Sequence, residues 1–153
     1  MPVIARPNLG SAVRARLLQF PEITSLVSSA AGWTDGRTEP RVGSQMHDKW
    51  HMPTRAIRLR RTGGALVEQD YSAGLWRSRI DLFCYGGHPH EAQQLIDVVL
   101  PALCPTQDTA AGFEIGGCRV GLIEPEADGF ADIDPTTSWP TAWVPLSILW
   151  VAA

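Results

Sequence analysis

The sequence has few residues that could form covalent or metal cross-links. Its three cysteines are widely spaced and never form a CxxC pair, a pattern that argues against a disulfide framework and against a zinc ribbon. We expect each to be a small buried hydrophobic residue. Lysine is nearly absent, because all basic residues except Lys49 are arginine. Charged contacts should therefore use the planar guanidinium group, although a GC-rich genome would give the same bias without any function.

Long apolar runs and catalytic signatures are also missing. No run approaches the ~20 residues needed to cross a bilayer, and "MPVIARPNLG" lacks the features of a signal peptide. We therefore expect a soluble intracellular product that does not contact a membrane. The chain has no GxSxG elbow, no GxxxxGKS or GxxxxGKT phosphate loop and no GxGxxG after a strand. These absences favour a protein that is not an enzyme and needs no cofactor.

The chain does have enough length for one core. With 153 residues, of which 44% are hydrophobic, a single domain spanning residues 1–153 is expected. The net charge of -3 hides an asymmetry. Residues 1–79 carry twelve basic and six acidic side chains, whereas residues 80–153 carry one basic and ten acidic side chains. The two halves can neutralise each other within one fold. They also suit a protein whose basic flank meets the acidic flank of a neighbouring copy.

The first 53 residues predict two short helices and a long loop. A capped helix should begin near Asn8 and end near Phe20, because the next residue is proline. A second helix is expected over about residues 22–30. Residues 32–53 show no sustained period and predict a loop, with an edge strand near residues 42–48.

Residues 54–85 predict an antiparallel meander of three strands. Aliphatic and arginine side chains alternate in the first strand, the "TGG" at residues 62–64 should form a turn, and residues 66–71 return as the second strand. In the third strand two faces alternate: Ile80, Leu82 and Cys84 against Arg77, Arg79 and Asp81. The meander should therefore have one apolar face and one charged face.

The stretch "GGHPH" predicts a turn from that strand into a helix. Its glycines allow the bend, Pro89 is tolerated in a first helical turn, and the charge of Glu91 favours the helix dipole. Apolar residues then recur at helical spacing as far as Leu103, so this helix should pack on the sheet. Pro101 should kink or end it.

Two closing strands are expected near residues 118–124 and 141–151, separated by an acidic loop. Pro145 within the second strand indicates a sheet edge or a bulge, because proline cannot donate to a ladder. The predicted fold is therefore α+β: an antiparallel or mixed β-sheet meander with an N-terminal helical segment and one central helix packed on one face.

The stretch "HDKWH" is the sharpest catalytic motif. If it were helical, His47 and His51 would share one face, with Asp48 where the zincin motif HExxH places its general base. A glycine and a proline bracket the segment, however, and no helical period runs through it. A zinc site that also used His88 and His90 has suitable ligands, but nothing in the sequence brings the two clusters together. We predict no metal site and no catalytic residue, and keep a small metal-dependent hydrolase using His47 and His51 as an alternative.

Arginine and tryptophan residues are the candidates for contacts with partners. The arginines of the meander could follow a nucleic-acid backbone, but the chain is acidic and no aromatic platform interleaves with them. A protein interface or a solvated sheet face is the better interpretation. Trp76 and Trp150 are in register with core positions and should be buried. Four tryptophans near loops are better candidates for exposure and partner contact: Trp33, Trp50, Trp139 and Trp143.

The step from "RSRIDLFCY" through a small turn into "EAQQLIDVV" has the pattern R-x-x-I-D-L-x-x-Y followed by E-A-x-x-L-x-x-x-V. This step follows a helical N-terminus, a long loop and an arginine-rich meander. Together they resemble the tail-terminator (tail-completion) proteins of long-tailed bacteriophages and gene transfer agents. The resemblance covers roughly Thr54 to Leu103. Over the first 53 residues only the element types agree, and "SWPTAWVPLSILW" does not align with the family pattern.

This resemblance implies a structural virion protein with a tail-terminator-like domain and no catalytic residues. Such proteins are assembled in the cytoplasm of the bacterial host. They form a ring, usually a hexamer, that caps the tail tube, stops its growth and presents a head-tail joining surface. The implied partners are further copies of the chain, the tail tube protein and a head-closure or connector protein. DNA would pass through the channel without specific binding.

A ring needs a heterologous interface that closes by rotation, and opposite charges on two sides suit such an interface. We hypothesise that basic residues of one subunit face acidic residues of the next: Arg58, Arg60, Arg77 and Arg79 against Glu124, Glu126, Asp128, Asp132 and Asp134. The same acids have a second use, which is to line the channel so that DNA does not adhere. The sequence does not choose between these uses. A head-closure or adaptor protein at the same neck is the alternative among virion proteins.

Overall fold

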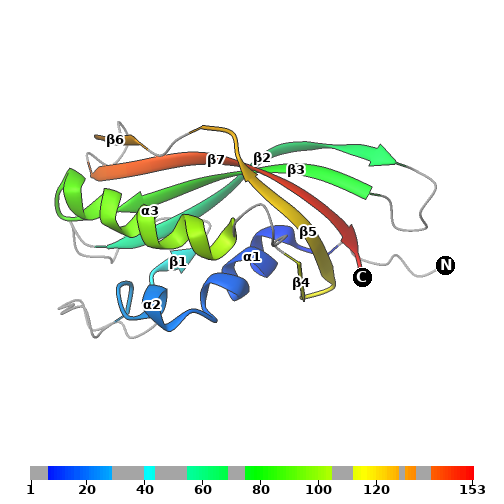
Figure 1. Cartoon of the computed structure of the whole chain (residues 1–153), viewed down its shortest axis with the longest axis horizontal. Coiled ribbons are helices and arrows are strands. Elements are labelled where there is room, and N and C mark those ends of the chain that lie inside the picture. Colours follow the sequence, from blue (N-terminus) through cyan, green and yellow to red (C-terminus); the bar gives the residue numbers. More distant parts are fainter. Residues whose placement is uncertain are drawn as a thin grey trace.

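The chain has an α+β fold, as predicted (Figure 1). The computed structural model describes residues 7–28, 40–43, 55–68, 75–104, 112–127, 130–133 and 139–153, with only the backbone for residues 64–68 and 130–132. Its elements, in chain order, are α1 (Leu9–Leu17), α2 (Pro21–Thr24), β1 (Val42–Gly43), β2 (Ala56–Glu68), β3 (Leu75–Tyr85), α3 (Pro89–Leu103), β4 (Phe113–Ile115), β5 (Cys118–Pro125), β6 (Phe130–Ile133) and β7 (Pro140–Ala152).

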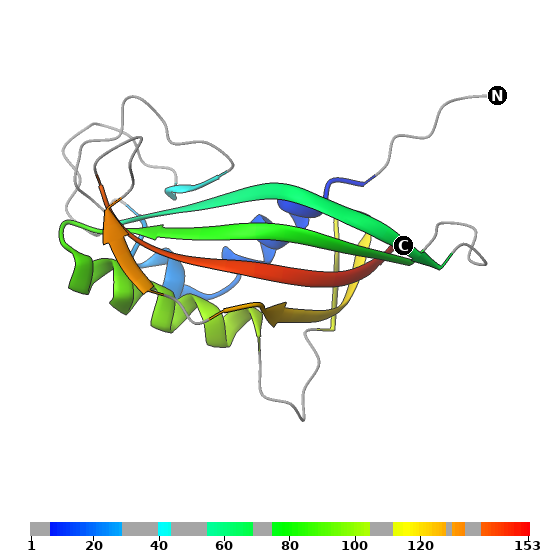
Figure 2. The same cartoon turned by 90° about the horizontal axis from the view of Figure 1, so that it is seen from above.

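The seven strands form one mixed sheet. Its order is β1-β2-β3-β7-β5-β4, with β6 pairing to β7, and every pairing is antiparallel except the parallel pair β1 and β2. Figure 2 shows β3 and β5 on opposite sides of β7. The helices lie against one side of the sheet (Figure 1), which we call the inner face; the opposite side is the outer face.

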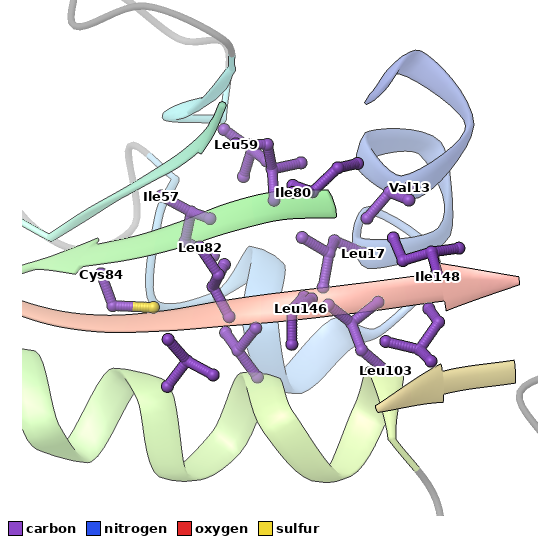
Figure 3. Close-up of a cluster of buried hydrophobic side chains, with 14 of the residues drawn as sticks. Val13, Leu17, Ile57, Leu59, Ile80, Leu82, Cys84, Leu103, Leu146 and Ile148 are labelled. Atoms are coloured by element: carbon purple, nitrogen blue, oxygen red, sulfur yellow. The ribbon is translucent and has the colours of Figure 1, made fainter. Parts of the chain in front are cut away.

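The core lies between the inner face and the helices (Figure 3). The apolar stripe predicted for α3 is confirmed, because five side chains at helical spacing are at most 1% exposed: Ala92, Leu95, Ile96, Val99 and Leu103. They meet fully buried aliphatic residues of the central strands, among them Ile80 and Leu82 of β3 and Leu146 and Ile148 of β7. Pro101 lies in the last turn of α3, two residues before its end. Burial of these apolar surfaces is the main stabilising contribution to the fold.

Helix α1 contributes the N-terminal part of the core. Asn8 caps it as predicted, since its side chain accepts the backbone N–H of Ser11 at 3.1 Å. Leu9, Val13 and Leu17 are fully buried on one helical face. Helix α2 ends at Thr24, earlier than predicted.

The "GGHPH" stretch forms the predicted turn from β3 into α3. His88 is the N-cap, and its Nδ1 accepts the backbone N–H of Glu91 at 3.3 Å. The Glu91 carboxylate accepts the N–H of Gly87 at 2.8 Å and forms an ion pair with Arg55 at 3.0 Å. Backbone donors at the start of the helix are therefore satisfied by side chains. Both histidines of this stretch have structural roles. His88 caps the helix, and the ring of His90 stacks on the ring of His88 with their centres 6.1 Å apart.

The predicted turn at residues 62–64 is wrong. Strand β2 runs through these residues without reversing, and it pairs with β3 along its whole length. The pairing shifts between Arg61 and Gly63, so one extra residue is inserted as a bulge. Gly63 has φ 153°, a conformation that a residue without a Cβ adopts easily. The meander is therefore one long hairpin of two strands.

The position predicted for Pro145 is also wrong, because β7 is a central strand. Pro145 stands where the neighbour of β7 changes: β5 pairs with residues 146–152 and β6 with residues 140–143. Its carbonyl accepts the N–H of Glu126 at 2.9 Å, so the backbone carbonyl of Pro145 faces this junction. The missing N–H of proline therefore falls where the β5 ladder has ended. An edge strand does occur near residue 42, where β1 covers two residues of β2.

Candidate assembly surface

The charged half of the outer face is built by β3, β7 and β5. Arg77 and Arg79 point outward from β3, with side chains 47% and 45% exposed. Arg77 Nη1 lies 3.9 Å from Glu124 Oε2, and Arg79 Nε lies 3.7 Å from Glu126 Oε2. Arg79 Nε also donates to Asp81 Oδ1 at 3.3 Å. Arginine and acidic side chains from opposite halves of the sequence therefore pair within one copy.

Sheet order explains this pairing. Strands β3 and β5 flank β7, and both Arg79 and Glu124 are register partners of Ser147. Arg77 Nη1 donates to Ser147 Oγ at 3.0 Å, which holds the arginine over β7. Ion pairs this exposed are each worth less than about 1 kcal/mol. The structure thus brings together two of the four predicted interface arginines and two of the five predicted acids, but it does so inside one chain.

The arginines of β2 are placed differently. The Arg58 guanidinium lies over the ring of Phe83, with Cζ 5.5 Å from the ring centre. Arg60 is exposed and has no ion-pair partner among the residues that the structure describes. Arg61, which sequence reasoning missed, is exposed and donates to the neutral Ser78 Oγ at 3.3 Å. The run "RLRR" was the available signal. The register partner of Arg61 is Ile80 of the inner face, so Arg61 points to the opposite side of the sheet from Arg60, whose register partner is Asp81.

The remaining predicted acids belong to one segment. Asp132 lies in β6, where it pairs with Thr141 of β7, and only its backbone is described. Asp128 and Asp134 lie outside the described residues. Subunit contact and channel lining therefore stay predictions for these three acids.

The other half of the outer face is aromatic, contrary to the prediction of a uniformly charged face. Phe83 stacks on Trp143 with ring centres 6.3 Å apart, and Tyr85 meets Trp139 edge-on at 5.4 Å. Tyr85 is fully buried and Trp139 is 4% exposed. Phe83, Trp143 and Arg58 are register partners across three strands. The signal in the sequence was the unbroken apolar run at residues 82–85, which is typical of a strand covered on both faces.

This cluster corrects two expectations about aromatic residues. Trp139 is not an exposed contact residue, because it packs on Tyr85, and Trp143 is only partly exposed. An aromatic row does adjoin Arg58, whereas the sequence suggested that no aromatic platform interleaves with the arginines. Trp33 and Trp50 lie outside the described residues. The buried position expected for Trp150 is confirmed, and its Nε1 donates to Ser78 Oγ at 2.9 Å; Trp76 is partly buried.

The three cysteines are thiols and form no disulfide with one another. Cys84 and Cys118 are buried, and Cys104 is partly buried. Burial raises the pKa of the Cys104 thiol to about 11 and raises the pKa of Cys84 further. Both of these thiols therefore stay protonated near neutral pH, and a protonated thiol is a poor nucleophile and a poor metal ligand.

Other kinds of site find little support in the part of the chain that the structure describes. Within those ranges, no three His, Cys, Asp or Glu side chains gather closely enough to hold a metal ion. His47 and His51 lie outside them. Of the helices described, none is long and apolar enough to cross a membrane. Hollows beside α1 and beside the end of β7 measure about 110 and 130 Å³, which is small against the ~300–1,000 Å³ of typical ligand pockets.

Comparison with known proteins gives one informative result. A scan of protein-family models finds no match, and neither does a search of curated proteins. Among solved structures, a chain from a structure described as "Virion of native gene transfer agent (GTA) particle" has a similar fold. The TM-score is 0.61 at 11% sequence identity, and the match covers 94% of this chain and 95% of that chain. The two chains share a fold over almost their whole lengths.

Proposed function

We propose that this chain is a structural protein of a phage-like virion. The observation that carries the proposal is the fold shared, over nearly all of both chains, with a component of a gene transfer agent virion. The sequence pattern of residues 77–99, read without any structure, independently resembles proteins of such particles. An enzyme is the weaker class, because the chain carries no recognised catalytic signature.

Within the virion, we assign the chain to the tail terminator. It would form a ring, with six subunits as the resemblance implies, on the end of the tail tube. The ring would stop tube growth and offer its far side to the head-closure or connector protein, while DNA passes through without specific binding. The strong opposition of charge between residues 1–79 and residues 80–153 supports contacts between unlike surfaces of neighbouring copies. Assembly would take place in the cytoplasm of the bacterial host.

The head-closure or adaptor protein is the second candidate. The description of the similar chain names the particle and not the chain's position in it. The shared fold is therefore compatible with a protein on either side of the head-tail junction. The two roles differ in their binding partner: a terminator binds the end of the tail tube, and a head-closure protein binds the portal side.

Growth of tail tubes in the presence of the purified protein tests the assignment. A terminator is expected to cap tube ends and to shorten the tubes as its concentration rises, which electron microscopy of the length distribution would measure. Unchanged tube lengths with binding to the portal side would identify the head-closure role instead. Binding to neither structure, together with one zinc ion per chain, would support the hydrolase alternative at His47 and His51.

A further inference from the structure

We propose that Ile133 of one copy of the chain inserts into an apolar hollow at the end of β7 on the next copy. The hollow is lined by Leu75 of β3, Gly121 of β5, and Leu149 and Val151 of β7. This inference rests on the proposed ring and adds to it one pair of surfaces that meet. The contact is apolar, so it is additional to any contact between charged groups.

The hollow lies on the outer face of the sheet. Leu149 is the register partner of Arg77, which points outward, and Leu75 and Val151 stand two positions further along the same two strands. The helices lie against the inner face, and these three apolar side chains are only partly buried. The space beside them measures about 130 Å³. Because an apolar cavity of about 150 Å³ can hold benzene, the hollow has room for one aliphatic side chain.

The sequence of β7 indicates that this end of the strand is covered on both faces. Residues 148–152, "ILWVA", form an unbroken apolar run, which is typical of a strand that is buried on each side. The inward-facing Ile148 and Trp150 are at most 1% exposed, whereas the outward-facing Leu149 and Val151 are partly exposed in the single copy. The run therefore fits a strand whose outer face is covered in an assembly.

Ile133 has the complementary property. Its side chain is 50% exposed, and no other leucine, isoleucine, valine or aromatic side chain that the structure describes is exposed to this degree. Burying such a side chain against apolar groups is favourable, since it removes apolar surface from water. Ile133 ends β6, where it is the register partner of Pro140 at the start of β7. The chain thus carries an exposed apolar side chain and an apolar hollow of suitable size.

Ile133 and the hollow cannot meet within one copy. Ile133 lies opposite Pro140, and Leu149 is nine positions further along β7. At ~3.3 Å per residue, about 30 Å of strand separates them. Figure 2 shows β6, in orange, beside the start of β7 and the C-terminus near its other end. A contact between copies therefore joins two unlike surfaces. Repeating it head to tail uses each surface once per copy, which is the condition for a ring.

Disulfide cross-linking tests which surfaces meet. Ile133→Cys and Val151→Cys are made as separate full-length variants, mixed and oxidised. The mixture should give a covalent dimer on a non-reducing gel, because residue 133 of one variant then lies beside residue 151 of the other. Each variant oxidised alone should give single chains, as should the unaltered protein with its three native thiols. A covalent dimer from Ile133→Cys alone would indicate a two-fold contact between identical surfaces and would contradict the proposal.

A charge placed on either surface should weaken the contact. Ile133→Asp and Val151→Asp are each expected to weaken self-association about 10- to 100-fold, measured by light scattering over a concentration series. Ser11→Asp is the matched control. Ser11 is exposed in the first turn of α1, on the helix side of the sheet, where a negative charge suits the helix dipole. This variant should assemble like the unaltered protein.

Circular dichroism of each variant checks that the fold is intact. If the unaltered protein forms rings and the mixed cysteine variants give no covalent dimer, the docking proposal is wrong while the proposed function stands. If the unaltered protein never self-associates, both are wrong. If Val151→Asp forms rings normally but no longer binds the ends of tail tubes, the hollow receives the tail tube protein instead of a second copy, and the proposal is overturned.

Discussion

Replacing Leu82 by alanine is expected to lower the free energy of unfolding by about 2–5 kcal/mol. Leu82 is fully buried at the middle of β3, and it pairs with Leu59 of β2 and Val144 of β7. Its side chain points into the core between the sheet and the helices (Figure 3). Close packing leaves nothing to fill the space of the removed carbons, so a cavity adds to the lost burial.

Urea denaturation followed by tryptophan fluorescence would measure this loss. Leu122→Ala is the matched control, because Leu122 is only partly buried and lies on β5 opposite Leu149. The control should lose less than half as much stability. Equal losses for the two variants would mean that the core is not centred between the inner face and the helices.

Replacing Gly86 by alanine is expected to destabilise the protein by about 1–3 kcal/mol, the usual range for overpacking. A Cβ on Gly86 would lie 2.7 Å from the backbone nitrogen of Ala92 and 2.9 Å from the carbonyl carbon of Glu91. These atoms belong to the first turns of α3 and cannot move aside like a flexible side chain. The substitution must therefore push α3 away from the end of β3, where the N–H of Gly86 also bonds the carbonyl of Pro140 at 3.2 Å.

The same substitution at Gly121 provides the control. A Cβ there would have Leu149 O as its nearest neighbour, at 3.8 Å, which is an ordinary contact. Thermal unfolding should therefore place Gly121→Ala close to the unaltered protein and Gly86→Ala well below it. If both variants unfold at the same temperature, close approach between α3 and the turn does not constrain residue 86.

Elements with a strong period of their own could be predicted from the sequence. The apolar stripe of α3 and the alternation of β3 and β7 each predict the side chains that are buried on the inner face, because burial on one face imposes the period. On the outer face the alternation fails, since Asp81, Thr141 and Ser147 are at most 8% exposed. The turn at "GGHPH" was predictable for a similar reason: glycine, proline and an early acidic residue have local roles at a helix start.

The "TGG" stretch shows where local reasoning fails. Two glycines between apolar runs are typical of a hairpin turn, but they also suit a bulge inside a long strand. The difference lies in the partner: β3 continues opposite β2 on both sides of Gly63. Pairing along a whole hairpin stabilises the strand more than a local turn preference can. The residues of a short stretch do not show which strand they will pair with, so this stabilisation cannot be predicted from them.

Contacts that depend on strand order could not be predicted at all. Arg77 and Glu124 are 47 positions apart and meet only because β3 and β5 lie on the two sides of β7. The same order separates β2 from β5. Charge counting predicted that opposite charges would meet, and the topology decided which of them do so within one chain.

The mass of the purified full-length protein, measured by native mass spectrometry and light scattering over a range of concentrations, tests the central claim most directly. The account predicts one closed assembly of defined mass, a ring of six chains if the family resemblance holds, that dissociates as salt screens its charged contacts. Single chains at every concentration, with no assembly on the ends of tail tubes, would contradict it.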